Sequence, residues 1–210
     1  MRSPKLLAAA AGLALLSGCA GGGLAGGPTG DFYGFQLIRA QPRTVARGTM
    51  TVTPTVEWNR IPRGQYDIGQ EENWTLNGPF LDGLTFIGGL ENNRRIVVQR
   101  RRDDRRVPDF RADMTPQEIA DMIESFYMIR AGSVRFDVTS VTPRPFLGQP
   151  GFQFDYNHLG GNEVERRGRA VGAIINNRLY LSLFDAARLH YFDAGLPEFE
   201  RIMNSARLRR

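Results

Sequence analysis

Alternation of apolar and polar residues in the second half of the chain constrains the fold more than any other feature of the sequence. Every second residue is apolar over 134–138 and again over 152–156, which is the period of a strand with one buried face. Residues 169–175 and 179–184 are apolar on both faces and flank Asn176-Asn177, a pair that tolerates the positive φ angles of a two-residue hairpin turn. The pattern predicts an antiparallel meander whose last two strands lie at the centre of the sheet, covered on both sides.

Two amphipathic helices are predicted around this meander. The first covers 114–129: Thr115 is its N-cap, Pro116 its first helical residue, and Glu118 completes a capping box. The second is predicted to begin at Pro197, with apolar residues on one stripe. Helices packed on an antiparallel sheet predict a single α+β domain, and we place its bounds at 31–210.

Shorter strand signals precede the first helix. The clearest alternation covers 49–58, but Pro54 cannot donate to a sheet ladder, so we expect an edge strand or a bulge there. Turn signals at Gly78-Pro79 and Asp82-Gly83 separate weaker candidates. The weaker strand candidates are 32–38, 72–77, 84–87 and 96–99.

Residues 1–18 have the features of a signal peptide. Arg2 and Lys5 precede an apolar run over 6–16, and small residues follow it. At 1.5 Å per residue, eleven residues cover only about 16 Å of a hydrocarbon core of roughly 30 Å. The run is therefore too short for a stable membrane span and is typical of a secretory signal.

The signal ends in Leu16-Ser17-Gly18-Cys19, which resembles the lipobox of bacterial lipoproteins. In that family the signal peptidase recognises the residues that correspond to Leu16, Ser17 and Gly18 and cuts just before the lipid-modified cysteine. The resemblance implies that Cys19 carries the membrane anchor. Ala20, rather than Asp, follows the cysteine, which implies the periplasmic face of the outer membrane. The alternative is an ordinary signal peptide whose removal leaves Cys19 as a free thiol.

Glycine-rich residues 19–30 are predicted to form a flexible tether between the anchor and the domain. An eleven-residue chain of this composition spans about 18 Å on average. Cys19 is the one cysteine of the sequence, so the folded part contains no disulfide and depends on its hydrophobic core.

The order of elements over 134–206 resembles the PsbP-like fold, which also occurs in DcrB-like bacterial lipoproteins. The resemblance is carried by a helix, two strands and a long hairpin that ends in Leu179-Tyr180-Leu181. Phe184-Asp185-Ala186-Ala187 and a closing helix that ends in Asn204-Ser205-Ala206 then follow. The resemblance implies an architecture and no particular activity, because members of one fold differ in function.

Residues with catalytic or metal-binding chemistry are sparse. The two histidines, His158 and His190, are far apart in the sequence, and no serine lies in a Gly-x-Ser-x-Gly elbow. We therefore predict no catalytic residue, metal site or cofactor. The alternative is an enzyme that acts on envelope glycans or lipids, in which dispersed acids such as Asp155, Glu163 and Asp185 converge in a cleft.

Arginines cluster between residues 94 and 106. One interpretation is a loop that binds anionic lipid headgroups or an acidic partner; the other is a solvated loop in which Asp103 and Asp104 cancel part of the positive field. A nucleic-acid partner is not expected, because no aromatic residue interleaves the run. The seven arginines are Arg94, Arg95, Arg100, Arg101, Arg102, Arg105 and Arg106.

These features predict a lipid-anchored protein of the cell envelope that binds or supports other components without catalysis. Its expected partners are the membrane and either an envelope protein or an anionic lipid. A purely structural role in a larger complex is a further hypothesis. Trp58, Tyr66 and Trp74 are expected to belong to a buried core rather than to a ligand groove.

Overall fold

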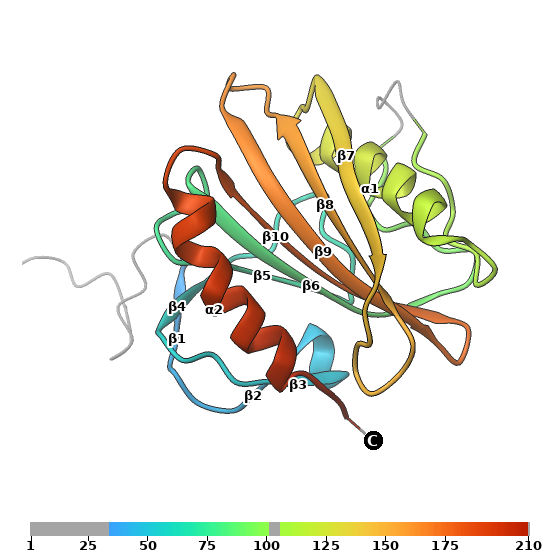
Figure 1. The fold of residues 1–210 in the computed structure, drawn as a ribbon, viewed down its shortest axis with the longest axis horizontal. Helices are drawn as coiled ribbons and strands as arrows, with labels where there is room; N and C mark the ends of the chain where they lie inside the picture. Colours follow the sequence, from blue (N-terminus) through green and yellow to red (C-terminus); the bar gives the residue numbers. More distant parts are fainter. Residues whose placement is uncertain (1–33, 101–105, 210) are drawn as a thin grey trace, which may run out of the picture.

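The computed structural model describes residues 34–100 and 106–209 (Figure 1). The predicted signal peptide, the lipobox and the tether lie outside the described residues, as do Arg101, Arg102 and Arg105. Within the described ranges, none of the helices has the length and apolar character that a membrane span requires.

An eight-stranded antiparallel sheet forms the body of the domain, in the order β1-β4-β5-β6-β10-β9-β8-β7. The predicted meander is confirmed as β7 to β10, and Asn176 and Asn177 make the β9–β10 turn with φ angles of 50° and 60°. β9 and β10 lie near the centre of the sheet, as predicted. The strand bounds are β1 Gln36–Ile38, β4 Trp58–Ile61, β5 Glu71–Thr75, β6 Asp82–Glu91, β7 Arg135–Pro143, β8 Phe152–Leu159, β9 Glu165–Ile175 and β10 Arg178–Ala187.

Two helices cover opposite faces of this sheet. Helix α1 (Pro116–Arg130) packs on one face, and helix α2 (Tyr191–Ser205) packs on the other (Figure 1). Leu183 of β10 belongs to the core under α1 and Phe184 to the core under α2, because successive side chains of a strand point to opposite faces. The capping box of α1 is confirmed: the Glu118 carboxylate accepts from the Thr115 amide at 2.7 Å.

A three-stranded sheet lies on the α2 side. Its order is β11-β3-β2, with bounds β11 Arg207–Leu208, β3 Met50–Val52 and β2 Arg43–Val45. The short helix η1 (Ala46–Gly48) connects β2 to β3. Buried Val45, Met50 and Val52 join the core under α2.

The predicted strand over 49–58 is wrong in its middle. The structure has β3 and β4 at its two ends and an irregular segment between them. Pro54 lacks an N–H, and the neighbouring amides bond to side chains of α2 instead of a strand: Thr53 donates to Ser205 at 2.8 Å and Thr55 to Glu198 at 2.7 Å. The segment is therefore held by α2 and not by a ladder.

The predicted start of the last helix at Pro197 is also wrong, because α2 begins at Tyr191 and Pro197 lies inside it. Aromatic packing extends the helix toward its N-terminus. Phe192 and Phe199 both stack on Phe184, with ring centroids 5.7 and 5.5 Å away. Burial of Phe192 thus places a helical turn before the proline.

Other short elements of the structure differ from the predicted ones in type or in their bounds. Residues 96–99 form no strand, although Ile96 and Val97 are buried. The predicted Asp82-Gly83 turn belongs to β6, because the turn occurs earlier, where Leu81 and Asp82 donate backbone hydrogen bonds to Gly78. The predicted strands over 32–38, 72–77 and 84–87 correspond to β1, β5 and β6, and residues 32–33 lie outside the described ranges.

Candidate functional site

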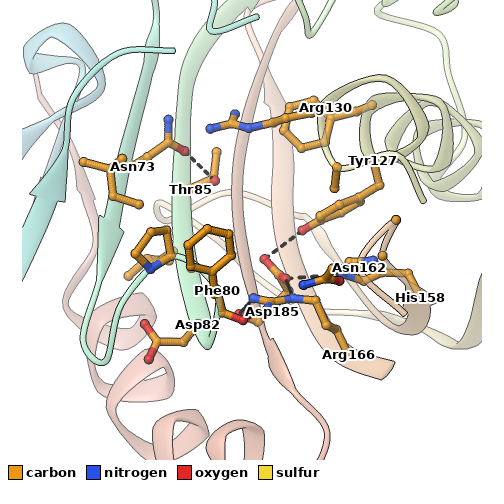
Figure 2. Close-up of a pocket in the computed structure, with 18 of the residues that line it drawn as sticks. Asn73, Phe80, Asp82, Thr85, Tyr127, Arg130, His158, Asn162, Arg166 and Asp185 are labelled. Atoms are coloured by element: carbon orange, nitrogen blue, oxygen red, sulfur yellow. Dashed lines mark hydrogen bonds and ion pairs between the residues drawn. The ribbon is translucent and has the colours of Figure 1, made fainter. Parts of the chain in front are cut away.

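A pocket of about 420 Å³ lies between α1 and the large sheet (Figure 2). Its walls are the C-terminal half of α1, strands β5 and β6 with their connecting loop, and the β8–β9 turn. Side chains of β8, β9 and β10 form its floor. A concave, partly apolar pocket with a few polar groups at its floor is the usual form of a small-molecule site.

The carboxylate of Asp185 is the centre of this floor. It accepts hydrogen bonds from Arg166 Nε at 2.5 Å, from the Tyr127 hydroxyl at 3.2 Å and from His158 Nε2 at 3.3 Å. We call these four side chains the Asp185 network. Burial alone would raise the pKa of Asp185, but the charge of Arg166 and the hydrogen bond from His158 outweigh it and hold that pKa well below its usual range. Asp185 is therefore ionised and cannot serve as a general acid.

Arg166 links the floor to the pocket mouth. Its guanidinium donates to the backbone carbonyls of Phe80, at 2.8 Å, and of Asp185, at 3.2 Å. Burial opposes its charge, yet the contact with Asp185 raises the pKa of Arg166 above its ordinary value. One cation thus joins β9, β10 and the β5–β6 loop.

His158 lies inside β8 with a buried side chain. Its Nδ1 contacts the Ser133 hydroxyl at 3.1 Å, while its Nε2 contacts Asp185. This Ser-His-Asp chain does not have the properties of a hydrolytic triad. The serine is buried and does not line the pocket, and the aspartate already forms an ion pair with Arg166.

Two tyrosines are joined to the Asp185 network, and of these Tyr127 lines the pocket. The hydroxyls of Tyr127 and Tyr156 lie 2.7 Å apart, and burial, followed by the nearby negative charge of Asp185, raises the pKa of both well above the ordinary value. Both are neutral at physiological pH. The Tyr156 ring covers Gly168, where any added Cβ would lie only 2.1 Å from the ring.

Arg130 of α1 forms the opposite wall. It pairs with Asp67 at 3.2 Å and with Glu71, and Asn73 donates to the same two carboxylates at 3.0 and 2.9 Å. Asn73 also accepts from the Thr85 hydroxyl at 2.6 Å. Figure 2 shows the Arg130 and Asn73 side chains across the pocket from Arg166 and Asp185. The cation of this wall is therefore already neutralised.

The pocket mouth carries an exposed aromatic ring. Phe80 is 78% exposed on the loop between β5 and β6, and Figure 2 shows its ring beside the Asp185 network. Buried Asp82 holds the loop, since its carboxylate accepts from the Thr75 hydroxyl at 2.8 Å and from the amides of Leu76 and Asn77 at 2.7 and 2.9 Å. An exposed ring on a fixed loop can contact a ligand without ordering the chain.

The structure does not bring the three dispersed acids together. Asp155 and Asp185 point to opposite faces of the sheet, because Asp155 pairs in register with Arg169 and Asp185 with Gly168 on the same strand, β9. Asp155 forms a bidentate pair with Arg169, at 2.7 and 2.8 Å. Glu163 is exposed in the β8–β9 turn. These three carboxylates therefore do not form the cleft that the enzyme alternative requires.

The described arginines of the 94–106 run lie outside the pocket. Arg95 pairs with Asp109 at 3.1 Å, and the Arg100 guanidinium lies 5.4 Å from the centre of the Tyr66 ring. Arg94 and Arg106 are exposed. Both interpretations of the run, a solvated loop and an anion-binding loop, stay predictions, and its described arginines make no part of the pocket.

Of the three aromatic side chains predicted to lie in the core, two are buried there. Trp58 and Trp74 have no exposed surface, and Trp74 also reaches the pocket wall. Tyr66 is half-buried against the core under α1. His190 is exposed before α2, where it has a φ of 72°. Over residues 34–100 and 106–209, no group of three His, Cys, Asp or Glu side chains is placed to hold a metal ion.

Comparison with known proteins identifies the fold. No protein-family model matches the chain, and no curated protein matches it. Among solved structures, it is similar to "Solution Structure of Cyanobacterial PsbP (CyanoP) from Synechocystis sp. PCC 6803". The TM-score is 0.54 at 14% sequence identity, over 92% of this chain and 99% of that chain. The protein therefore has a PsbP-like fold, a single domain with a large antiparallel sheet and two helices, as the order of its elements predicted.

Proposed function

We propose that this protein is a lipid-anchored binding or accessory protein of the bacterial cell envelope, and that the pocket beside α1 holds a small ligand without transforming it. The proposed anchor is Cys19 in the lipobox-like segment Leu16-Ser17-Gly18-Cys19. Two chains already give stable membrane attachment, because each buried methylene contributes about 0.8 kcal/mol. The proposed place is the periplasmic face of the outer membrane.

One observation carries the choice of binding over catalysis: the acid at the pocket floor is fully engaged. A general acid or base needs a pKa near the working pH, and a nucleophile needs an adjacent free base. Asp185 is held ionised by three donors, and the pKa values of Tyr127 and Tyr156 are raised. These groups fix the shape of the floor and do not exchange protons at physiological pH.

The charges of the pocket favour an uncharged ligand. Arg166 pairs with Asp185, and Arg130 with Asp67 and Glu71, so an anionic ligand finds no free cation among these groups. The carboxylate of Asp82, which also lines the pocket, is held by the Thr75 hydroxyl and two backbone amides. The exposed Phe80 ring offers an apolar surface at the mouth. An uncharged molecule with one or two rings and several hydroxyl groups, such as a neutral sugar of the envelope, fits this chemistry and a volume of about 420 Å³.

The test is an NMR titration of the chain from Ala20 onward with two uncharged probes, N,N′-diacetylchitobiose and an alkyl glucoside. We expect shifts of the Phe80 and Asn162 amides and no change in the probe itself. Phe80→Ala should weaken binding roughly tenfold. Leu189→Ala is the matched control, since this side chain is 86% exposed and does not line the pocket. Cleavage of a probe, or equal effects of the two variants, would refute a binding role for the pocket.

A further inference from the structure

The three-stranded sheet joins two parts of the chain that contain no acidic residue. Neither 32–56 nor 201–210 contains an Asp or a Glu. β3 pairs with β2 on one side and with β11 on the other, which brings these two distant segments side by side. Figure 1 shows β2 and β3 at the lower edge of the domain, next to the C-terminal end of α2.

Five arginines lie in or next to this sheet. Arg43 pairs in register with Val52 and therefore lies on the core side, so we call the surface of the other four, Arg39, Arg47, Arg207 and Arg209, the basic face. Among the described residues, none of these five guanidinium groups is within ion-pair distance of a carboxylate, whereas most other described arginines form such pairs. Arg43 Nε is buried without a hydrogen-bond partner, and Arg207 donates to two carbonyls at the end of α2. The five are Arg39, Arg43, Arg47, Arg207 and Arg209.

The sheet presents one side outward. Val45, Met50 and Val52 point into the core, so the alternating Thr44 and Thr51 point away from it. Arg207 pairs in register with Thr51 and is exposed. Arg39, Arg47 and Arg209 are exposed as well. The outward side therefore combines threonine hydroxyls with Arg207, and exposed Arg39, Arg47 and Arg209 lie in the segments that flank its strands, none of them paired with a carboxylate of the described residues.

We infer that the basic face binds the anionic phosphate headgroups of the bilayer to which the chain is tethered, an inference that rests on the proposed lipid anchor. Guanidinium groups bind phosphate with paired hydrogen bonds, and an anionic bilayer attracts arginines held close to its surface. The predicted tether is short, about 18 Å on average, so it keeps the domain near the headgroups.

This contact leaves the pocket accessible. The pocket lies under α1, and the three-stranded sheet packs into the core under α2, on the other side of the large sheet. Docking through the basic face thus turns the α1 side of the domain away from the membrane. A ligand in the periplasm reaches the pocket without displacing the protein from the bilayer.

The test measures sedimentation of the chain from Ala20 onward with vesicles of phosphatidylcholine alone or mixed with phosphatidylglycerol. A chain that starts at Ala20 lacks Cys19, so the result is independent of lipidation. We expect binding to the anionic vesicles only, weakening as salt is added. Arg39→Gln/Arg47→Gln/Arg209→Gln should reduce the partition coefficient roughly fivefold per arginine, or about a hundredfold in total.

A second variant separates the basic face from the arginine run. Arg94→Gln/Arg95→Gln/Arg106→Gln removes the same charge from the 94–106 segment and should retain most of the binding. Fluorescence of the buried Trp58 and Trp74 verifies that each variant is folded. Equal binding to both vesicle types, or a loss in the 94–106 variant as large as in the basic-face variant, overturns the inference. Neither result affects lipid labelling of Cys19, which tests the proposed anchor separately.

Discussion

Arg166 and Asp185 form the ion pair on which the pocket floor is built. Arg166 Nε donates to the carboxylate at 2.5 Å, and both side chains are mostly buried, with exposed fractions of 9% and 14%. The same guanidinium holds the Phe80 carbonyl, so the pair fixes the mouth of the pocket as well as its floor.

Removal of Arg166 should destabilise the domain strongly. Arg166→Gln leaves a buried carboxylate without its cation, which typically lowers the free energy of unfolding by about 3–5 kcal/mol. Urea denaturation followed by tryptophan fluorescence measures the change. Arg135→Gln is the control, since its ion pairs are exposed and contribute about 1 kcal/mol or less. Similar losses in the two variants would contradict a supporting role for the Arg166–Asp185 pair.

The free energy of unfolding should decrease at acidic pH, because Asp185 becomes protonated and loses its ion pair. Its folded-state pKa lies below the ordinary value, so it stabilises the fold fully above the unfolded-state pKa of about 3.9, and this stabilisation is lost as the pH falls below that value. The pKa values of Glu198 and Glu200 are also lowered, so they contribute in the same direction.

Asp185→Asn isolates the contribution of this group. The variant should be less stable at neutral pH and should show a flatter dependence of unfolding free energy on pH between about 5 and 2. Denaturant titrations at several pH values provide the measurement. An unchanged slope would mean that Asp185 does not titrate in the way its surroundings require.

Gly168 should tolerate no side chain. The added Cβ of Gly168→Ala would overlap the Tyr156 ring, displace it and break its hydrogen bond to Tyr127. We expect a loss of about 1–3 kcal/mol in unfolding free energy. In Gly83→Ala, the new Cβ meets its nearest neighbour, Asp185, at an ordinary 3.5 Å, so this control should be far milder. Equal stability of both variants would show that Tyr156 can move at little cost.

Ser133 should contribute to the stability of the fold and not to catalysis. Ser133→Ala removes its contact with His158 Nδ1 and should lower the unfolding free energy by about 1 kcal/mol. Hydrolysis of p-nitrophenyl acetate, measured for both proteins, should stay at the background rate. An ester hydrolysis that disappears in Ser133→Ala would instead identify the serine as a nucleophile.

Locally encoded features were predictable from the sequence. The capping box of α1 needs only Thr115 and Glu118, and the β9–β10 turn needs only Asn176 and Asn177. Elements set by distant packing were not predictable. The early start of α2 depends on the contact between Phe192 and Phe184.

The Asp185 network was not predictable from the sequence either, because it is set by packing between distant residues. Tyr127, His158, Arg166 and Asp185 come from four elements, and no local motif connects them. The strand register, in which His158 faces Arg166 and Gly168 faces both Tyr156 and Asp185, brings the three strand positions together, and packing of α1 on the sheet adds Tyr127. The predicted pairing of β8 with β9 could have suggested that His158 faces Arg166. The exact register, however, is set by turns and packing that the sequence does not display directly.

The proposed lipid attachment at Cys19 is what would place the pocket and the basic face at a membrane. Intact-mass spectrometry of the mature N-terminus, after expression in a bacterium with lipoprotein processing, tests it most directly. We predict a chain that begins at Cys19 and carries a diacylglyceryl thioether and an acylated amino group, and that loses both in Cys19→Ala. A mature N-terminus with a bare, unmodified thiol would contradict the account.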